Sequence, residues 1–321
     1  MRGKTFVNIS FLKYYAAHNN FNPDVSQIDA ARPWKAVRLR RIREISGLGG
    51  AMNEQLLKTA VDCVKEGGAV LLNYYNKLET LQIQSKGRFD YVTEADLAAQ
   101  EAIVQLIQSR HPDHEILAEE DESSTGQNAS RWLVDPLDGT TNFIHGFPVF
   151  AVSVALEYKD AIVLGAVYDP CRQELFLAQK GHGATLNGRP IQVSNRRKVD
   201  EALVATAFPW REKTILSHYL KGFNRVFAKV SDMRRGGSAA LDLSYVACGR
   251  CEGYWELGLS PWDIAAGHLL VKEAGGYISD FSGGNNHIWT GDVVAGNQSI
   301  HTFLLEILRE VFGGNVSEHG A

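Results

Sequence analysis

An apolar run that ends abruptly in two acids constrains this chain most: residues 132–143 read WLVDPLDGTTNF. The first three residues favour burial, yet Asp135 and Asp138 follow almost at once. Two carboxylates buried close together are costly unless a proton or a cation neutralises one of them. The stretch therefore predicts a strand that ends at a metal site, at a protonated pair, or in solvent.

The residues around these acids add features of an anion site. Pro136 fixes its own φ and keeps Asp135 extended, so we expect Asp135 to leave the strand in a defined direction and Asp138 to lie on the following turn. Gly139 allows close backbone approach, and residues 140–142 supply the groups typical of a helix start, where N–H groups and the helix dipole favour an anion. This combination favours Mg²⁺ shared between protein and phosphate.

Acids recur at the ends of other predicted elements. Glu119 and Glu120 follow a predicted strand, Asp96 begins a predicted helix, and Asp263 begins another. Hard oxygen ligands that converge from several elements predict two or three Mg²⁺ ions. For an Asp-Gly pair alone, a tight loop with no function remains the alternative interpretation.

Hydrophobic periodicity predicts an α+β layered protein. The predicted strands of residues 150–179 follow one another across short turns, which indicates antiparallel pairing. Asn187-Gly188 predicts a hairpin turn. Helices are predicted over residues 52–77, 94–110, 217–230, 237–250, 262–275 and 299–312, and strands near 81–93 and over 115–120, 131–136, 150–158, 161–169, 174–179, 204–208, 253–257 and 293–297.

Charge divides the chain near residue 51. Residues 1–51 hold nine Lys and Arg and three Asp and Glu, a net +6, so the remaining 270 residues carry −10 of the total of −4. We expect residues 1–51 to be a basic N-terminal extension, either disordered or not native, and residues 52–321 to form the folded domain. An organelle transit peptide and a start codon assigned too early fit this segment equally well.

Composition excludes some classes of function. No apolar run approaches the length of about 18 residues that a membrane span needs. A net charge of −4 argues against bulk nucleic-acid binding, without excluding a local basic patch. Four cysteines without a secretory apolar segment predict reduced thiols and a cytoplasmic protein.

Two other phosphatase and hydrolase chemistries fit poorly. Aspartyl-phosphate phosphatases use D-x-D-G-T with the first Asp as nucleophile, whereas two residues, including Pro136, separate the acids here. The two side chains then point differently, which disfavours a covalent aspartyl intermediate. No G-x-S-x-G elbow is present for a serine hydrolase.

Four segments together resemble the inositol monophosphatase family, over a region from about residue 52 to the C-terminus. The resemblance implies a layered αβαβα sandwich, Mg²⁺ as cofactor, inhibition by lithium, and usually a homodimer, with residues 52–321 as the phosphatase domain. The segments are DPLDGTTNF at 135–143, WDIAAG at 262–267, AEED at 118–121 and RRGGSAALDLSYVACGR at 234–250.

The resemblance implies a set of metal ligands. Glu119, Asp135 and the Leu137 carbonyl would hold the first Mg²⁺. Asp135, Asp138 and Asp263 would hold the second. A weaker third ion would depend on Glu119 and water, and Glu120 is the residue most easily confused with Glu119.

The resemblance also implies catalytic and substrate-binding residues. Thr140, oriented by Asp96, and Glu119 would act on the attacking water, and the amides of Gly139 and Thr140 would receive the phosphate. Lys86 would lie near the third ion. Three alternatives stay open: Asp96 as a helix cap, Lys86 as a solvated loop charge, and Glu256 as an exposed strand acid. The substrate pocket would be lined by Gly237, Ser238, Ala239 and Glu256.

The leading hypothesis is that metal-activated water hydrolyses inositol 1-phosphate, and related small polyol or sugar monophosphates, to the alcohol and phosphate. Alternatives on the same fold are phosphatases for fructose 1,6-bisphosphate, histidinol phosphate or 3'-phosphoadenosine 5'-phosphate. Relatives specific for the adenosine nucleotide commonly resemble DGTKEF, from which residues 141–143 depart. A different class is a regulatory binding protein associated with RNA or transcription, which would use the basic segment 1–51.

Overall fold

The computed structural model describes residues 50–87, 89–121, 129–211 and 213–313. All of them belong to residues 42–321, the second of two units into which the chain divides. The predicted extension 1–51 lies almost wholly outside the described residues. Among the described residues, no helix is both long enough and apolar enough to cross a membrane.

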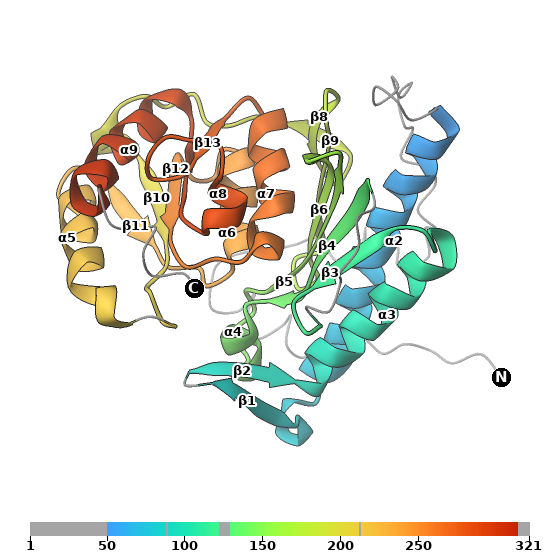
Figure 1. Ribbon diagram of the computed structural model, residues 1–321. Coiled ribbons are helices and arrows are strands. Elements are labelled where there is room, and N and C mark those ends of the chain that lie inside the picture. The colour runs from blue at the N-terminus through green and yellow to red at the C-terminus, as the bar shows by residue number, and fades with distance from the viewer. Residues whose placement is uncertain (1–49, 88, 122–128, 212, 314–321) are drawn as a thin grey trace, which may run out of the picture. The chain divides into compact units, whose positions relative to one another are not determined.

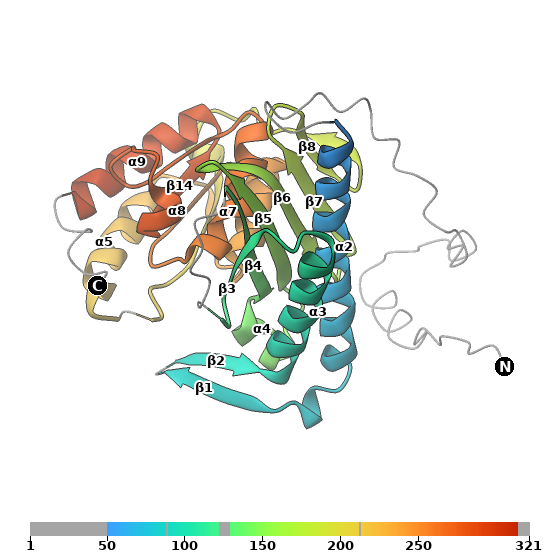
Figure 2. The ribbon, with the colours of Figure 1, turned by 45° about the vertical axis from the view of Figure 1, so that its right-hand side comes forward.

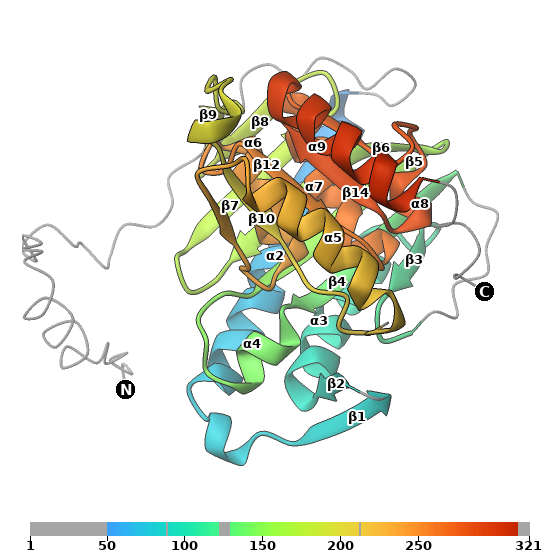
Figure 3. The same ribbon diagram turned by 90° about the vertical axis from the view of Figure 1, so that its left-hand side faces the viewer.

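The described residues form five alternating layers of helices and sheets (Figure 1). Helices α2 (Gly50–Tyr75) and α3 (Glu94–Arg110) cover one face of a seven-stranded sheet, as Figure 2 shows. Helices α6 (Ala239–Ala247) and α7 (Pro261–Glu273) lie between that sheet and a five-stranded sheet. Helices α5 (Leu216–Phe227) and α9 (Gln298–Phe312) cover the outer face of the smaller sheet (Figure 3). The predicted αβαβα sandwich is confirmed.

The larger sheet has the order β3-β4-β5-β6-β7-β8-β9. Only β3 and β4 pair in parallel, and every later pair is antiparallel, as predicted for residues 150–179. Asn187 and Gly188 both have positive φ, of 49° and 76°, and form the predicted hairpin turn. The strands are β3 (Glu115–Ala118), β4 (Ser130–Asp138), β5 (Ala151–Tyr158), β6 (Ala161–Asp169), β7 (Glu174–Gln179), β8 (Gly183–Leu186) and β9 (Arg189–Ile191).

The smaller sheet has the order β11-β10-β12-β14-β13, and a separate hairpin joins β1 to β2. Its central strand β12 pairs in parallel with β10 and antiparallel with β14. The strands are β10 (Leu203–Thr206), β11 (Asp232–Arg234), β12 (Gly253–Glu256), β13 (Tyr277–Ser279) and β14 (Val293–Gly296), with β1 (Ile83–Gly87) and β2 (Asp90–Thr93) in the hairpin.

Several short elements carry no periodic pattern and were not predicted. β11 and β13 have three residues each, too few for an alternation to stand out. The others are the helix α8 (His287–Thr290) and the 3₁₀ turns η2 (Leu78–Thr80), η3 (Val199–Glu201) and η4 (Lys213–Ile215). The helix start predicted at residues 140–142 is confirmed by the short helix α4 (Thr140–Ile144).

The prediction that Asp138 lies on a turn is wrong. Strand β4 continues to Asp138, which pairs with Ala151, while Asp135 pairs with Ser153. Three steps along β4 therefore match two steps along β5, so a β-bulge separates the acids. The bulge bends the strand after Asp135, and pairing with β5 then resumes.

The central strands are buried on both faces, because helices cover both sides of the larger sheet. Every residue of β5 from Ala151 to Glu157 is buried, which explains a continuous apolar run instead of an alternating one. Helix α7 packs especially closely on β6. A Cβ atom added at Gly165 would lie 2.8 Å from the Ala266 carbonyl oxygen and 3.0 Å from its Cα atom.

We expect Gly165→Ala to lower the free energy of unfolding by about 1–3 kcal/mol, because the added methyl group meets the backbone of α7, which has no flexible side chain to move aside. Urea denaturation measures the change. Gly87→Ala is the matched control, since a Cβ atom at Gly87 has no other heavy atom within 4 Å. Equal stability of the two variants would contradict the close packing of α7 on β6.

Candidate metal and phosphate site

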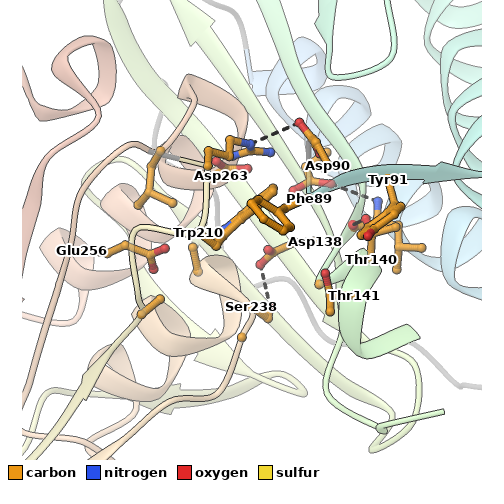
Figure 4. Close-up of a pocket in the computed structure, with 18 of the residues that line it drawn as sticks. Phe89, Asp90, Tyr91, Asp138, Thr140, Thr141, Trp210, Ser238, Glu256 and Asp263 are labelled. Atoms are coloured by element: carbon orange, nitrogen blue, oxygen red, sulfur yellow. Dashed lines mark hydrogen bonds and ion pairs between the residues drawn. The ribbon is translucent and has the colours of Figure 1, made fainter. Parts of the chain in front are cut away.

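One cavity of about 350 Å³ collects most of the residues that the sequence singles out. Acids and small residues form one part of its wall, and aromatic and basic side chains form another (Figure 4). The predicted site residues that line it are Glu119, Asp135, Leu137, Asp138, Gly139, Thr140, Gly237, Ser238, Ala239, Glu256 and Asp263. Asp96, Glu120 and Lys86 lie behind this lining.

Asp135 occupies the most enclosed position among these acids. Its side chain is 1% exposed, and its Oδ1 accepts a hydrogen bond from the Leu137 N–H at 2.9 Å. Burial raises the pKa of Asp135 well above its usual range, and the charges of Glu119, Asp138 and Asp263 raise it further. The like charges show that the acids are close enough to repel one another, which a bound cation would relieve.

Asp138 is held by the N-terminus of α6. Its Oδ2 accepts hydrogen bonds from the Ser238 hydroxyl at 2.5 Å and from the Ala240 N–H at 2.7 Å. Burial raises the pKa of Asp138 to about 6, although these hydrogen bonds favour the charged form. One oxygen is thus fixed by the protein, and the carboxylate has a defined orientation.

Asp263 is likewise held at a helix start, that of α7. It is the third residue of that helix and forms a capping box with Ser260, whose N–H donates to Asp263 Oδ2 at 2.8 Å. Burial raises the pKa of Asp263 to about 8, with the charges of Asp138 and Glu119 adding to the effect. The cap explains why this acid stays at a fixed place despite its unfavourable environment.

These three acids have the chemistry of a divalent-cation site. None of them forms an ion pair with a described Lys or Arg, and a buried carboxylate without a counter-charge is costly. Among the described residues, no three His, Cys, Asp or Glu side chains are already gathered as a closed ligand set. Mg²⁺ does not need one, because it commonly uses one or two carboxylates and completes its shell with water and phosphate. The residues present therefore fit Mg²⁺.

Thr140 and Asp96 form a hydrogen-bonded pair beside these acids. The Thr140 hydroxyl lies 3.1 Å from Asp96 Oδ1 and 3.1 Å from the Leu137 carbonyl oxygen. Asp96 Oδ2 accepts from the N–H and the hydroxyl of Thr93, at 2.9 and 2.5 Å, in a capping box. Burial raises the pKa of Asp96 to about 6. Asp96 is therefore a helix cap and a partner of Thr140 at once.

Gly139 adopts a backbone conformation that other residues rarely adopt, with φ of 100°. A Cβ atom there would lie 3.0 Å from the Val149 carbonyl oxygen and 3.2 Å from that of Gly237. The same close approach puts the chain after β4 against the segment before α6. Gly139 thus brings the two halves of the cavity wall together.

Glu119 and Glu120 are distinguished by their position. Glu119 lines the cavity, and its N–H donates to the Val134 carbonyl at 3.1 Å, whereas Glu120 is not part of the lining. Lys86 lies 3.2 Å from Glu119 Oε1 and 2.5 Å from Glu120 Oε1. Lys86 lies on β1 and is exposed, yet its ammonium group pairs with both acids, which favours a place beside the cavity wall over a solvated loop charge.

Glu256 lies on the smaller sheet, on the far side of the cavity from Thr140 (Figure 4). It is the last residue of β12 and is 6% exposed, so the alternative of an exposed strand acid is wrong. Burial raises the pKa of Glu256 to about 7, and the Tyr254 hydroxyl, which donates to it, acts in the opposite direction.

Aromatic and basic residues across the cavity mouth were not predicted. The Arg211 guanidinium lies 3.3 Å from Asp90 Oδ2 and 4.1 Å from the centre of the Trp210 ring. Lys213 Nζ lies 3.4 Å from the centre of the Phe89 ring. The segment after β10 therefore contacts the β1–β2 hairpin. The sequence gives one indication of this region: Trp210, Arg211 and Lys213 follow the predicted strand 204–208 closely.

Further lining residues were not predicted as site residues, although Thr141 belongs to the helix start that the sequence predicted. They are Tyr91, Thr141, His145, Ala207, Arg235 and Leu259.

Comparisons with known proteins agree on one family. The model of the inositol monophosphatase family matches residues 52–312. The Nus factor SuhB of Salmonella typhimurium and the inositol-1-monophosphatase of Mesorhizobium japonicum are each 43% identical over 256 residues, 79% of this chain and 96% of the relative. The crystal structure of extragenic suppressor protein suhB from Bartonella henselae has a TM-score of 0.77 and 42% identity, covering 79% of this chain and 98% of that chain.

We expect Mg²⁺ to stabilise chelator-treated protein by about 2.7 kcal/mol at a hundredfold excess over Kd. Burial raises the pKa values of Asp138 and Asp263 above the usual 3.8 of an aspartate, so the folded protein binds more protons than the unfolded chain as pH rises. Without Mg²⁺, stability should therefore fall between about pH 4 and pH 8. The gain from Mg²⁺ should be larger at pH 8 than at pH 6.

Thermal melting with and without Mg²⁺ measures this effect. Asp138→Asn should lose most of the Mg²⁺-dependent gain, whereas the exposed control Asp113→Asn should keep it. Equal stabilisation of Asp138→Asn and wild type would rule out Asp138 as a ligand.

Proposed function

Because the chain belongs to the inositol monophosphatase family, we propose that it is a Mg²⁺-dependent phosphomonoesterase. Its substrates are inositol 1-phosphate and related small polyol or sugar monophosphates, which it hydrolyses to the alcohol and phosphate. The observation that carries the proposal is a set of three carboxylates that line the same cavity as Thr140. Asp135 and Asp263 are buried and Asp138 is half-buried, and none of the three forms an ion pair with a Lys or Arg among the described residues.

Two or three Mg²⁺ ions, when bound, supply charge neutralisation and an acidified water. Glu119, Asp135 and the Leu137 carbonyl would hold the first ion, and Asp135, Asp138 and Asp263 the second. A dianionic phosphate ester repels an anionic nucleophile, so carboxylates alone would oppose binding of the substrate. The proposal thus assigns the acids to cation binding instead of direct contact with phosphate.

The Thr140–Asp96 pair positions the attacking water in this proposal. Asp96 is buried and fixed through Oδ2, which leaves Oδ1 to accept a proton from the Thr140 hydroxyl. Thr140 in turn can accept from water, so that the proton moves toward the buried carboxylate as the nucleophile forms. Gly139, which has no side chain, leaves room for a phosphate against the backbone there.

The opposite wall receives the alcohol part of the substrate. Glu256 would accept hydrogen bonds from substrate hydroxyls, and Gly237, Ser238 and Ala239 would line that part of the pocket. Apart from Ser238, these residues present backbone and a methyl group, so shape and one carboxylate would decide the fit.

The proposal extends to the organisation of the chain. The phosphatase domain would comprise residues 52–321, preceded by a basic extension at residues 1–51. As the family resemblance implies, the protein would be a homodimer that lithium inhibits, and its cysteine content favours the cytoplasm.

We expect Mg²⁺-dependent phosphate release from inositol 1-phosphate to fall at least about 10²-fold in Asp138→Asn, because loss of one charge weakens the ion that shields the phosphate. A panel with fructose 1,6-bisphosphate, histidinol phosphate and 3'-phosphoadenosine 5'-phosphate measures specificity. Asp113→Asn serves as the control. Faster hydrolysis of another substrate would change the proposed substrate but not the proposed metal site. Full turnover after removal of Mg²⁺ by a chelator would refute the proposal.

A second candidate is a regulatory binding protein associated with RNA or transcription. The name "Nus factor SuhB", which relatives 43% identical carry, favours it. The two roles are compatible, because residues 1–51 carry a net charge of +6 and the acids of the cavity lie in the rest of the chain.

If the basic segment binds nucleic acid, the full chain should bind RNA with an affinity that falls steeply with salt, while a chain that begins at residue 52 should lose this binding. Fluorescence anisotropy at several salt concentrations measures both, and phosphate release by both chains checks that the shorter one is folded. Absence of salt-sensitive binding by the full chain would remove this candidate.

A further inference from the structure

Tyr254 and Glu256 form a buried pair behind the alcohol side of the cavity. They are two residues apart on β12, so their side chains leave the same face of the strand. The Tyr254 hydroxyl lies 2.5 Å from Glu256 Oε2. Tyr254 is 0% exposed and Glu256 is 6% exposed, so water does not compete freely for this hydrogen bond.

The pair has a defined direction. Burial raises the pKa of Tyr254 well above its usual range, with the Glu256 charge next in effect, so its hydroxyl stays protonated and donates. Among the described residues, Tyr254 is the only donor of a hydrogen bond to the Glu256 side chain. A charge-assisted bond of this kind is short and about twice as strong as a neutral one. Oε2 is thus engaged, and Oε1 is the oxygen available to the cavity.

The Tyr254 ring is itself held firmly. Its backbone pairs with Ala205 of β10 and with Ala295 of β14, at the centre of the smaller sheet. The ring belongs to a core cluster that includes residues of α6 and α7. The Tyr254 hydroxyl therefore has little freedom to move, and its hydrogen bond restricts the orientation of the Glu256 carboxylate.

We propose that Tyr254 is a positioning residue that makes the site selective for phosphate monoesters of polyols, by fixing Glu256 so that one oxygen faces the substrate hydroxyls. The inference rests on the proposed phosphatase function. Tyr254 does not touch the substrate in this arrangement, because Glu256 lines the cavity and Tyr254 does not. Its influence should be seen only with substrates whose hydroxyl groups reach Glu256.

The substrate pair that separates this role from a general one is inositol 1-phosphate and 4-nitrophenyl phosphate. Both present a phosphate monoester, but only the first carries hydroxyls. Tyr254→Phe keeps the ring and removes the hydroxyl. We expect a KM for inositol 1-phosphate about 3- to 10-fold higher, the effect of one lost hydrogen bond, with kcat within about twofold. The kinetic constants for 4-nitrophenyl phosphate should stay within about twofold.

Tyr219→Phe is the matched control. Tyr219 is also 0% exposed, its hydroxyl lies 3.2 Å from that of Thr206, and it is not among the residues that line the cavity. This variant should leave both substrates unaffected. A double-mutant cycle with Glu256→Gln tests the route of action: the effect of Tyr254→Phe on KM should vanish once Glu256 is replaced.

An equal loss on both substrates, a loss in kcat alone, or failure of Tyr254→Phe to fold would overturn the proposal and assign Tyr254 a structural role. An unchanged KM for inositol 1-phosphate would also overturn it. Failure of the proposed function looks different, since wild-type protein would then release phosphate from neither substrate with Mg²⁺ present.

Discussion

The hydrogen bonds between Asp138 and the start of α6 hold the site together. Asp138 ends β4 of the larger sheet, and its Oδ2 accepts from Ser238 and from the Ala240 N–H at the start of the middle helical layer. The backbone of Gly139 closes the same junction, since even a Cβ atom there would meet the carbonyl oxygens of Val149 and Gly237. This junction places the acids of β4 and Glu256 of the smaller sheet around one cavity.

The same physical device recurs at two other helices. Thr93 and Asp96 form a capping box at the start of α3, and Ser260 and Asp263 form one at the start of α7. A capping acid satisfies N–H groups that the helix leaves unpaired, and it is stabilised by the helix dipole. The fold thereby holds acids in a buried site that would otherwise expel them. One oxygen stabilises a helix, and the other remains for chemistry.

Much of this could be predicted from the sequence because it is local. A cap and its acid lie three residues apart, so Thr93 and Asp96 are visible together in the chain. The apolar run before Asp135 predicts the strand that contains this residue. The bulge that returns Asp138 to the strand could not be predicted, since it depends on pairing with β5, whose register the sequence of β4 does not encode.

The sequence by itself determined the layered α+β class, the family and the acids that are candidate cation ligands. Periodicity and short motifs depend only on residues close together in the chain. Only the tertiary structure decided which donors fix those acids and what surrounds them. Ser238 lies 100 residues from Asp138, and Arg211 lies 121 residues from Asp90, so no local pattern links them. Such contacts arise when two sheets pack on a shared helical layer, and packing depends on the whole chain at once.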